Sequence, residues 1–180
     1  MKLNLGCGSN KIPGYTNVDV EPSCEPDLVH DFTKAPLPFE DNSVEEILFF
    51  HTVEHISKKL HHAIFNEFWR VLKPGGTLIV SYPEFRVCVE NWLKNEGDIK
   101  DFWEATIYGA QRYPSDYHVC IMDSHQFTHF LKCMSFINVI AKPEPGQSCN
   151  SFVHCQKGPK LANYEDIIQQ GMEQYVIKGA

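Results

Sequence analysis

Leu3-Asn4-Leu5-Gly6-Cys7-Gly8 is a short β-rich run that leads directly into a Gly-x-Gly turn. Glycines in such a turn accept positive φ angles and let backbone N–H groups approach a ligand closely. The next β-rich run, 16–20, carries Asp19, and a carboxylate near the end of the second strand can bind the two hydroxyls of a ribose. Together these features predict a nucleoside site, and an ordinary strand-to-turn corner is the simpler alternative.

A dinucleotide is the less favoured ligand for this turn. Lys11 replaces the third glycine of the Gly-x-Gly-x-x-Gly pattern, and the short span from Gly8 to Asp19 contains Pro13 and Gly14. A helical crossover between parallel strands needs a dozen or more residues, so this one has room for at most one helical turn. Because a diphosphate relies on the N-terminus of a real helix, we expect a ligand without phosphates rather than a nicotinamide or flavin dinucleotide.

The rest of the first half alternates strands with one helix. The runs 27–30, 46–50 and 77–82 have strand composition, and a helix between the last two ends at the glycine stop 73–76. Its apolar face is predicted to consist of Ile56, Leu60, Ile64, Phe68, Val71 and Leu72, at helical spacing. His61 and His62 lie on the opposite face, which we expect to be solvated. The order of elements predicts an open α/β sheet with five parallel strands.

The second half adds a lid and an antiparallel strand pair. A helix at 85–93 ends near Gly97, and 98–123 has no strong period, which is typical of an insertion. Asp123 is the expected N-cap of a helix at 124–134. The strands 136–142 and 151–156 are joined too closely for a helical crossover, so they pair antiparallel. We predict one Rossmann-like domain over 1–160, with 83–123 as the lid, and a C-terminal helix or tail at 161–180.

Composition narrows the class of partner. The 180 residues carry a net charge of -7, which disfavours a nucleic acid partner. No apolar run reaches the roughly 18–20 residues that span a bilayer, and the N-terminus lacks the features of a signal peptide. The chain has seven cysteines, an odd number, and none of them forms a Cys-x-x-Cys pair. We expect reduced thiols in a cytoplasmic protein.

The motifs and their order resemble those of the class I S-adenosylmethionine-dependent methyltransferases, and most of all the small proteins of the methyltransferase type 11 sort. The resemblance is carried by the runs 3–8 (LNLGCG), 14–19 (GYTNVD), 37–43 (LPFEDNS), 51–56 (HTVEHI) and 71–76 (VLKPGG). It covers about 3–82 well and 83–157 loosely. It implies S-adenosylmethionine as cofactor, bound at the carboxyl edge of the sheet.

The resemblance also implies roles for individual residues. The cofactor-binding set would be Leu5, Gly6, Cys7, Gly8, Asp19, Val20, Asp31, Phe32 and His51. Within this set the glycine turn would pack against the methionine and ribose portions, and Asp19 would accept hydrogen bonds from the ribose. Asp31 and Phe32 would hold the adenine, and His51 would lie by the methionine end.

Three features depart from the commoner family pattern. Asn4 stands where an acidic residue is usual, and Asn10 stands where a further glycine is common. The helix that usually precedes the first strand is missing from this sequence. These departures bear on cofactor affinity and on how one face of the sheet is covered.

Methyl transfer to an oxygen needs a general base that removes the proton of the acceptor. From their positions in the sequence, the candidates are His118 first, then Tyr82 and Glu84. No Asn-Pro-Pro-Tyr or Asp-Pro-Pro-Tyr sequence follows the fourth strand, which disfavours an adenine or a glutamine amide as the acceptor. We expect a small-molecule or glycan-like acceptor. A cofactor-binding module without catalysis is the alternative. A zinc hydrolase using His51, Glu54 and His55, which match His-x-x-Glu-His, is a third interpretation, although we expect no metal.

Overall fold

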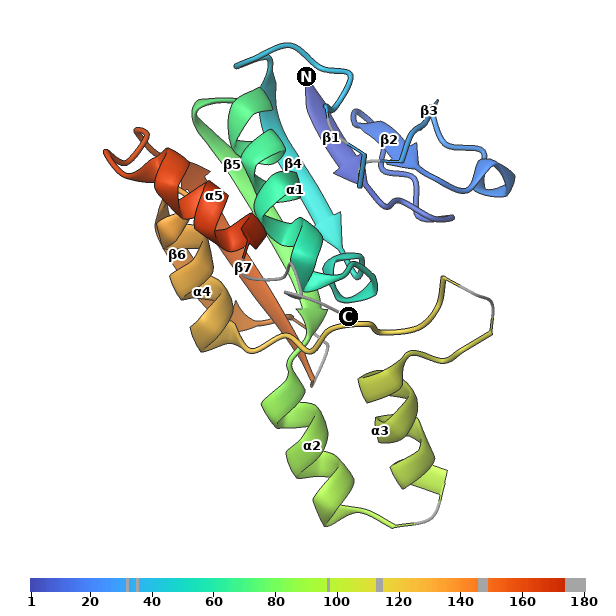
Figure 1. Ribbon diagram of the computed structural model, residues 1–180. Coiled ribbons are helices and arrows are strands. Elements are labelled where there is room, and N and C mark those ends of the chain that lie inside the picture. The colour runs from blue at the N-terminus through green and yellow to red at the C-terminus, as the bar shows by residue number, and fades with distance from the viewer. Residues whose placement is uncertain (32, 35, 97, 113–114, 146–148, 174–180) are drawn as a thin grey trace.

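One mixed sheet of seven strands organises the described part of the chain, which is every residue except 32, 35, 97, 113–114, 146–148 and 174–180 (Figure 1). In this computed structural model the strand order is β3-β2-β1-β4-β5-β7-β6. The strands are β1 (Lys2–Leu5), β2 (Thr16–Asp19), β3 (Leu28–Val29), β4 (Val44–Phe50), β5 (Leu72–Pro83), β6 (Phe136–Pro143) and β7 (Asn150–Lys157). The first five are parallel, and β7 runs antiparallel to β5 and β6. This confirms the predicted Rossmann-like sheet.

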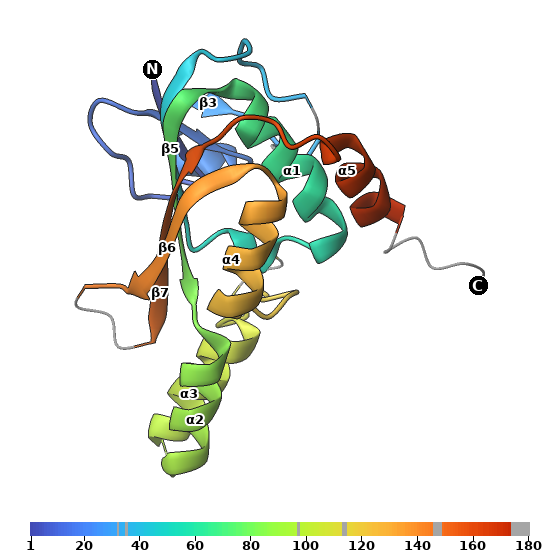
Figure 2. The same ribbon diagram turned by 90° about the vertical axis from the view of Figure 1, so that its left-hand side faces the viewer.

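The helices divide into a layer on the sheet and a projecting hairpin. They are α1 (Lys58–Val71), α2 (Phe85–Lys94), α3 (Asp98–Tyr108), α4 (Ser124–Cys133) and α5 (Tyr164–Glu173), with short 3-10 turns η1 (Pro22–Cys24) and η2 (Val53–His55). Figure 2 shows α1, α4 and α5 on one face of the sheet, and no α-helix of the described residues covers the other. The hairpin of α2 and α3 projects from the edge where the parallel strands end (Figure 1). No helix of the described residues is long and apolar enough to cross a membrane.

Aromatic side chains join the sheet to its helical layer. Phe49 of β4 lies 5.1 Å, centroid to centroid, from Phe68 of α1, and Phe65 lies 5.2 Å from Phe68, both in edge-on contacts. All three rings are fully buried. On the outer side of α1, the buried Tyr164 of α5 lies 5.4 Å from Trp69 and donates to Asn66 Oδ1 at 2.9 Å. The main core therefore lies between the sheet and this one layer of helices.

The buried face of α1 is displaced from the predicted one. Leu60 is 38% exposed, whereas His61 is only 6% exposed and its Nε2 lies 3.1 Å from the carbonyl oxygen of Ile56. His61 shares a face with Ile64 and Phe68, because residues three, four and seven apart align along a helix. The expectation that His61 is solvated is wrong, and burial lowers its pKa to about 4. His62 is half-buried, with its ring edge-on to a phenylalanine of α4.

The predicted lid contains a helix that periodicity did not reveal. Helix α3 pairs with α2, yet its apolar residues Ile99 and Phe102 are each 58% exposed and Trp103 alone is counted as buried. A helix that buries one residue has no apolar stripe for a sequence pattern to detect. By contrast, α4 begins after its predicted cap, since Asp123 Oδ1 accepts from Gln126 N at 3.0 Å. The predicted stop at Gly97 lies outside the described residues.

Side-chain amides order the connection between β1 and β2. Asn4 is 4% exposed, and its Nδ2 donates to Asn10 O at 3.0 Å and to Asn17 Oδ1 at 2.9 Å. Asn17 in turn accepts from Ile12 N at 2.8 Å and donates to Asp27 Oδ2 at 2.8 Å. A carboxylate cannot donate hydrogen bonds, so an acidic residue at position 4 would face two acceptors. The departure at Asn4 is thus explained by the loop that it supports.

Stability should depend on pH through His61. The unfolded histidine titrates near 6.5 and the folded one near 4, so between these values only the unfolded chain takes up the proton. We expect this residue to lower the free energy of unfolding by about 3 kcal/mol between pH 7 and pH 4. Urea unfolding at several pH values measures this effect. As the pH falls, the free energy of unfolding should decline less in His61→Gln than in wild type, and the exposed His125→Gln serves as control. Equal pH slopes for wild type and His61→Gln would contradict the assignment.

Replacing Asn4 by the family's usual acid should destabilise the chain. Asn4→Asp removes two buried donors and opposes a carboxylate to two acceptors, which should cost roughly 2–4 kcal/mol. The control is Asn10→Asp, which makes the same chemical change at an exposed position of the same loop and should cost under about 0.5 kcal/mol. Chemical denaturation of the three proteins measures both values. Equal stability of Asn4→Asp and wild type would overturn the proposed role of the amide.

Candidate cofactor site

The glycine turn after β1 is closed on one side and open on the other. Gly6 N and Cys7 N donate to Val18 O at 2.8 and 3.1 Å, and the φ angles of Gly6 and Gly8 are +71° and +48°. A Cβ added to Gly6 would lie 2.3 Å from Thr52 Oγ1, whereas one added to Gly8 would meet no atom within 4 Å. Gly6 therefore allows close packing against the segment after β4, and Gly8 faces free space.

Asp19 is held at the open side of this turn. Its Oδ2 accepts from Gly8 N at 2.8 Å, and its Oδ1 accepts from Glu21 N at 2.9 Å. The half-buried carboxylate is thereby oriented by two backbone donors, and each oxygen keeps a further lone pair for a ligand. The turn and the acid that the sequence singled out are therefore in direct contact.

The other residues of the predicted cofactor set differ in how available they are. Leu5 and Cys7 are buried at the end of β1, and Val20, just after β2, is 53% exposed. Asp31 is engaged within its own turn: Oδ1 accepts from Thr33 N at 3.1 Å, and Oδ2 pairs with Lys34 Nζ at 3.1 Å. The Thr33 hydrogen bonds keep the pKa of Asp31 below its usual value. Phe32 lies outside the described residues.

His51 stands at the edge where β4 ends, between two carboxylates. Its φ is +48°, and its backbone N donates to Ser81 O at 2.9 Å. Nδ1 lies 3.6 Å from Glu54 Oε1, and Nε2 lies 3.6 Å from Glu144 Oε2. The Glu54 carboxylate raises the pKa of His51, Glu144 adds to this, and burial opposes both. The ring thus connects the segment after β4 to the β6–β7 connection.

Two of the three candidate bases are buried and hydrogen-bonded to neighbouring side chains or backbone. Tyr82 is fully buried, its Oη lies 3.2 Å from Ser124 Oγ, and burial raises its pKa. Glu84 is 8% exposed, and its Oε2 accepts from Ser124 N and from Ser151 Oγ, each at 3.0 Å. These side chains join the end of β5 to α4 and β7. In each of them an oxygen that could take up a proton is already hydrogen-bonded to a serine.

The third candidate, His118, belongs to a cluster that the sequence pattern did not reveal. We define the Glu-His-His cluster as Glu54, His55 and His118, whose ligand-type atoms all lie within 4.8 Å of one another. The rings of His55 and His118 are in edge-on contact at 4.8 Å, centroid to centroid. Burial lowers the pKa of His118, and Glu54 opposes this. Glu54 and His55 precede α1 and His118 lies in the lid, so local spacing held no signal for their contact.

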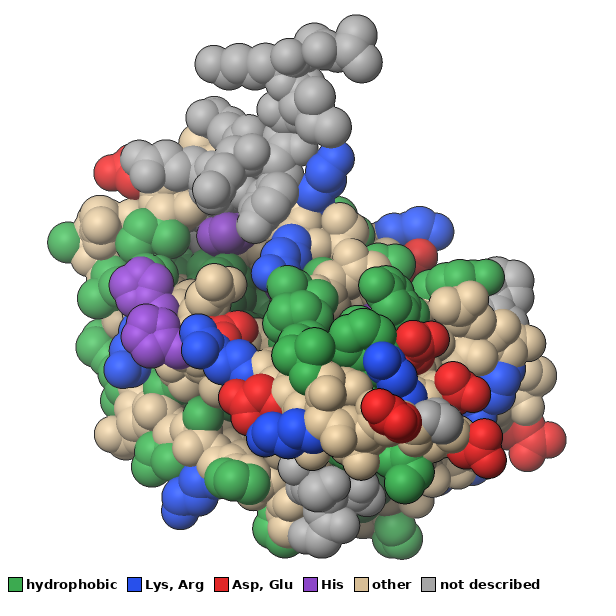
Figure 3. Space-filling model, turned by 90° about the horizontal axis from the view of Figure 1, so that it is seen from below, with side chains coloured by type: hydrophobic (Ala, Val, Ile, Leu, Met, Phe, Trp, Pro, Cys, Tyr) green, Lys and Arg blue, Asp and Glu red, His purple; other side chains and the backbone are tan. Residues whose placement is uncertain are grey.

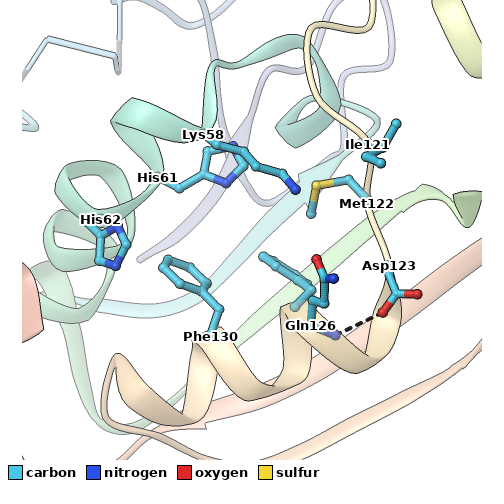
Figure 4. Close-up of a pocket in the computed structure, with 9 residues that line it drawn as sticks. Lys58, His61, His62, Ile121, Met122, Asp123, Gln126 and Phe130 are labelled. Atoms are coloured by element: carbon cyan, nitrogen blue, oxygen red, sulfur yellow. Dashed lines mark hydrogen bonds between the residues drawn. The ribbon is translucent and has the colours of Figure 1, made fainter. Parts of the chain in front are cut away.

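A cavity lies elsewhere, between α1 and α4 (Figure 4). It is lined by Lys58, His61, His62, Ile121, Met122, Asp123, Gln126, Phe127 and Phe130. None of the predicted cofactor residues is among them. This cavity is therefore distinct from the glycine turn and from Asp19.

Comparison with known proteins is consistent with this geometry. Residues 15–80 match the family model for a methyltransferase domain, a span that includes Asp19, His51, Glu54 and His55. A search of the curated proteins finds no match to the chain.

Solved structures show the same fold at low sequence identity. An S-adenosylmethionine-dependent methyltransferase of Methanosarcina mazei is 19% identical with a TM-score of 0.58, over 87% of this chain and 92% of that one. A protein of Pyrococcus horikoshii OT3 is 17% identical with a TM-score of 0.61, over 87% and 81%. A possible histamine N-methyltransferase of Thermotoga maritima is 13% identical with a TM-score of 0.58, over 87% of this chain and 81% of that one. Residues 15–80 thus resemble a methyltransferase domain, and these solved structures share the fold of the chain.

Proposed function

We propose that the chain transfers the methyl group of S-adenosylmethionine to a hydroxyl of a small-molecule or glycan-like acceptor. The observation that carries the proposal is the Asp19 carboxylate, which two backbone N–H groups hold beside the open side of Gly8. A carboxylate oriented at a glycine turn suits the paired hydroxyls of a ribose. The absence of a helix in this crossover suits a nucleoside without phosphates.

The chain's own residues would bind and orient the donor. The backbone of Gly6, Cys7 and Gly8 would lie along it, Asp19 would accept from the ribose, and His51 would lie near the methionine end. Leu5, Val20 and Asp31 would complete the pocket. When bound, the donor supplies a methyl group on a positively charged sulfur, so the protein needs no covalent nucleophile. Its task is to align the acceptor atom with that methyl group.

The Glu-His-His cluster supports an acceptor that must lose a proton. Burial lowers the pKa of His118, so its ring is neutral near pH 7 and able to accept a proton. Similar structures include a carbon methyltransferase and a possible histamine N-methyltransferase, so the fold alone does not select the acceptor atom. The proposal of a hydroxyl acceptor therefore depends on the side chains at the carboxyl edge of the sheet.

The α2–α3 hairpin would cover the acceptor. It stands at the edge where β4 and β5 end, and the backbone of His118 donates to Tyr108 O at 3.0 Å, which joins the cluster to the end of α3. Seen from below, hydrophobic side chains gather in the middle of the face, with charged side chains around them (Figure 3). Leu93, Ile99 and Phe102 of the hairpin are all strongly exposed. This apolar surface suits the uncharged part of an acceptor.

Binding of the reaction product tests the role of Asp19. We expect Asp19→Asn to weaken S-adenosylhomocysteine binding 10- to 100-fold in calorimetry, because about 1.5–3 kcal/mol of charge-assisted hydrogen bonding is lost. The control is Glu40→Gln, an exposed acid before β4 at the opposite edge of the sheet, which should bind as wild type does. Undiminished affinity of Asp19→Asn, or stronger thermal stabilisation by a nicotinamide dinucleotide than by S-adenosylhomocysteine, would refute the site.

Turnover separates the enzyme from a binding module. Release of S-adenosylhomocysteine from S-adenosylmethionine should be stimulated by at least one member of a panel of hydroxyl-bearing small molecules and glycans. With that acceptor, His118→Ala should lower kcat about 10²- to 10⁴-fold while the affinity for S-adenosylhomocysteine stays the same. Tight product binding without turnover on any acceptor would instead indicate a binding module.

A further inference from the structure

We propose that the Glu-His-His cluster is a binding site for a first-row divalent metal ion of the zinc type. The three residues supply two imidazole nitrogens and one carboxylate, all within 4.8 Å of one another. They come from η2, directly after β4, and from the end of the lid. This is a different set from the His-x-x-Glu-His pattern, because His51 is directed toward Glu144 as well as Glu54.

The state of Glu54 is the first argument. The residue is 2% exposed, and neither carboxylate oxygen has a hydrogen-bond partner among the residues that the structure describes. Its ion pair with His51 Nδ1 spans 3.6 Å, which is longer than a hydrogen bond. A buried carboxylate without donors costs several kcal/mol unless a cation compensates it. A metal ion bound to Glu54 would remove the part of this cost that His51 does not offset.

His55 is oriented as a metal-ligating histidine usually is. His55 Nδ1 lies 3.0 Å from Tyr117 O, so this nitrogen carries the hydrogen and Nε2 keeps a free lone pair. A ligating histidine typically donates its other N–H to a carbonyl or carboxylate, which sets the tautomer and the ring direction.

The backbone holds the two halves of the cluster together. Val119 N and Cys120 N both donate to Glu54 O, at 2.9 and 3.3 Å. On the other side of His118, a Cβ added to Gly109 would lie 1.9 Å from Asp116 O, so the loop closes only with glycine there. The segment that carries His118 is thus tied to η2 before any ion binds. Such preorganisation lowers the entropic cost of forming a site.

The ligand set selects the class of ion. Two histidines and one glutamate are a known set for catalytic zinc, with a fourth position left open, whereas Mg²⁺ and Ca²⁺ prefer oxygen ligands alone. Ligand atoms about 2 Å from a tetrahedral ion lie roughly 3.3 Å apart, so modest side-chain rotations would complete the site. As an extension that rests on the proposed function, an ion here would lower the pKa of an acceptor hydroxyl at the open position. His118 would then act as a ligand rather than as the base.

Metal titration of the full chain tests the site. After treatment with a chelator, the protein should bind one equivalent of Zn²⁺ in calorimetry, and Co²⁺ should give the visible absorption of a four-coordinate nitrogen and oxygen site. His55→Ala, His118→Ala and Glu54→Gln should each weaken Zn²⁺ binding at least about 100-fold. The control is His125→Ala, which removes an exposed histidine of α4 and should leave the affinity unchanged.

Stability gives a second readout that is independent of turnover. Without metal, Glu54→Gln should unfold at a higher temperature than wild type, because the amide removes a buried charge. Zn²⁺ should raise the Tm of wild type and not that of Glu54→Gln. No Zn²⁺ binding, unchanged binding in His118→Ala, or a sulfur-to-cobalt charge-transfer band, which would indicate cysteine ligands, would each overturn the proposal. Binding of S-adenosylhomocysteine to the metal-free chain is measured in parallel, so failure of the metal site is distinguishable from failure of the cofactor site.

Discussion

The close contact between the glycine turn and Thr52 is the constraint on which the site depends. Parallel pairing of β1 with β4 brings Gly6 so near Thr52 that no Cβ fits between them. On one side of this contact, Gly8 orients Asp19, and on the other, the chain continues through η2 to Glu54 and His55. The glycine turn and the Glu-His-His cluster are thereby held in fixed relation to each other.

The described residues form a single helical layer on the sheet. The connection from β1 to β2 lacks a helix, and Asn4 and Asn17 satisfy its backbone polar groups instead. The α2–α3 hairpin lies at the carboxyl edge of the sheet (Figure 1). Its return segment, anchored on Glu54 O, delivers His118 to the cluster. Among the described residues, the helical layer thus lies on one face of the sheet, and the additional helical hairpin lies near the candidate site.

Elements with a strong local signal were predictable. The five parallel strands, the antiparallel β6–β7 pair and the Asp123 cap depend on apolar runs, short connections and a capping residue, all of which neighbouring residues specify. Two features were not. Helix α3 buries Trp103 alone, so it shows no period, and the inward face of α1 depends on how the helix packs, which places His61 where Leu60 was expected.

For the site, the sequence by itself determined the glycine turn, the acid after the second strand and their shared sheet edge, because parallel strands bring their carboxyl ends together. Only the tertiary structure decided which side chains remain available there. Tyr82 and Glu84 are engaged in hydrogen bonds with serines of α4 and β7, and Glu54 meets His118 across the lid. Such contacts join residues far apart in the chain, and they are set by packing, which the spacing of residues along a sequence does not encode.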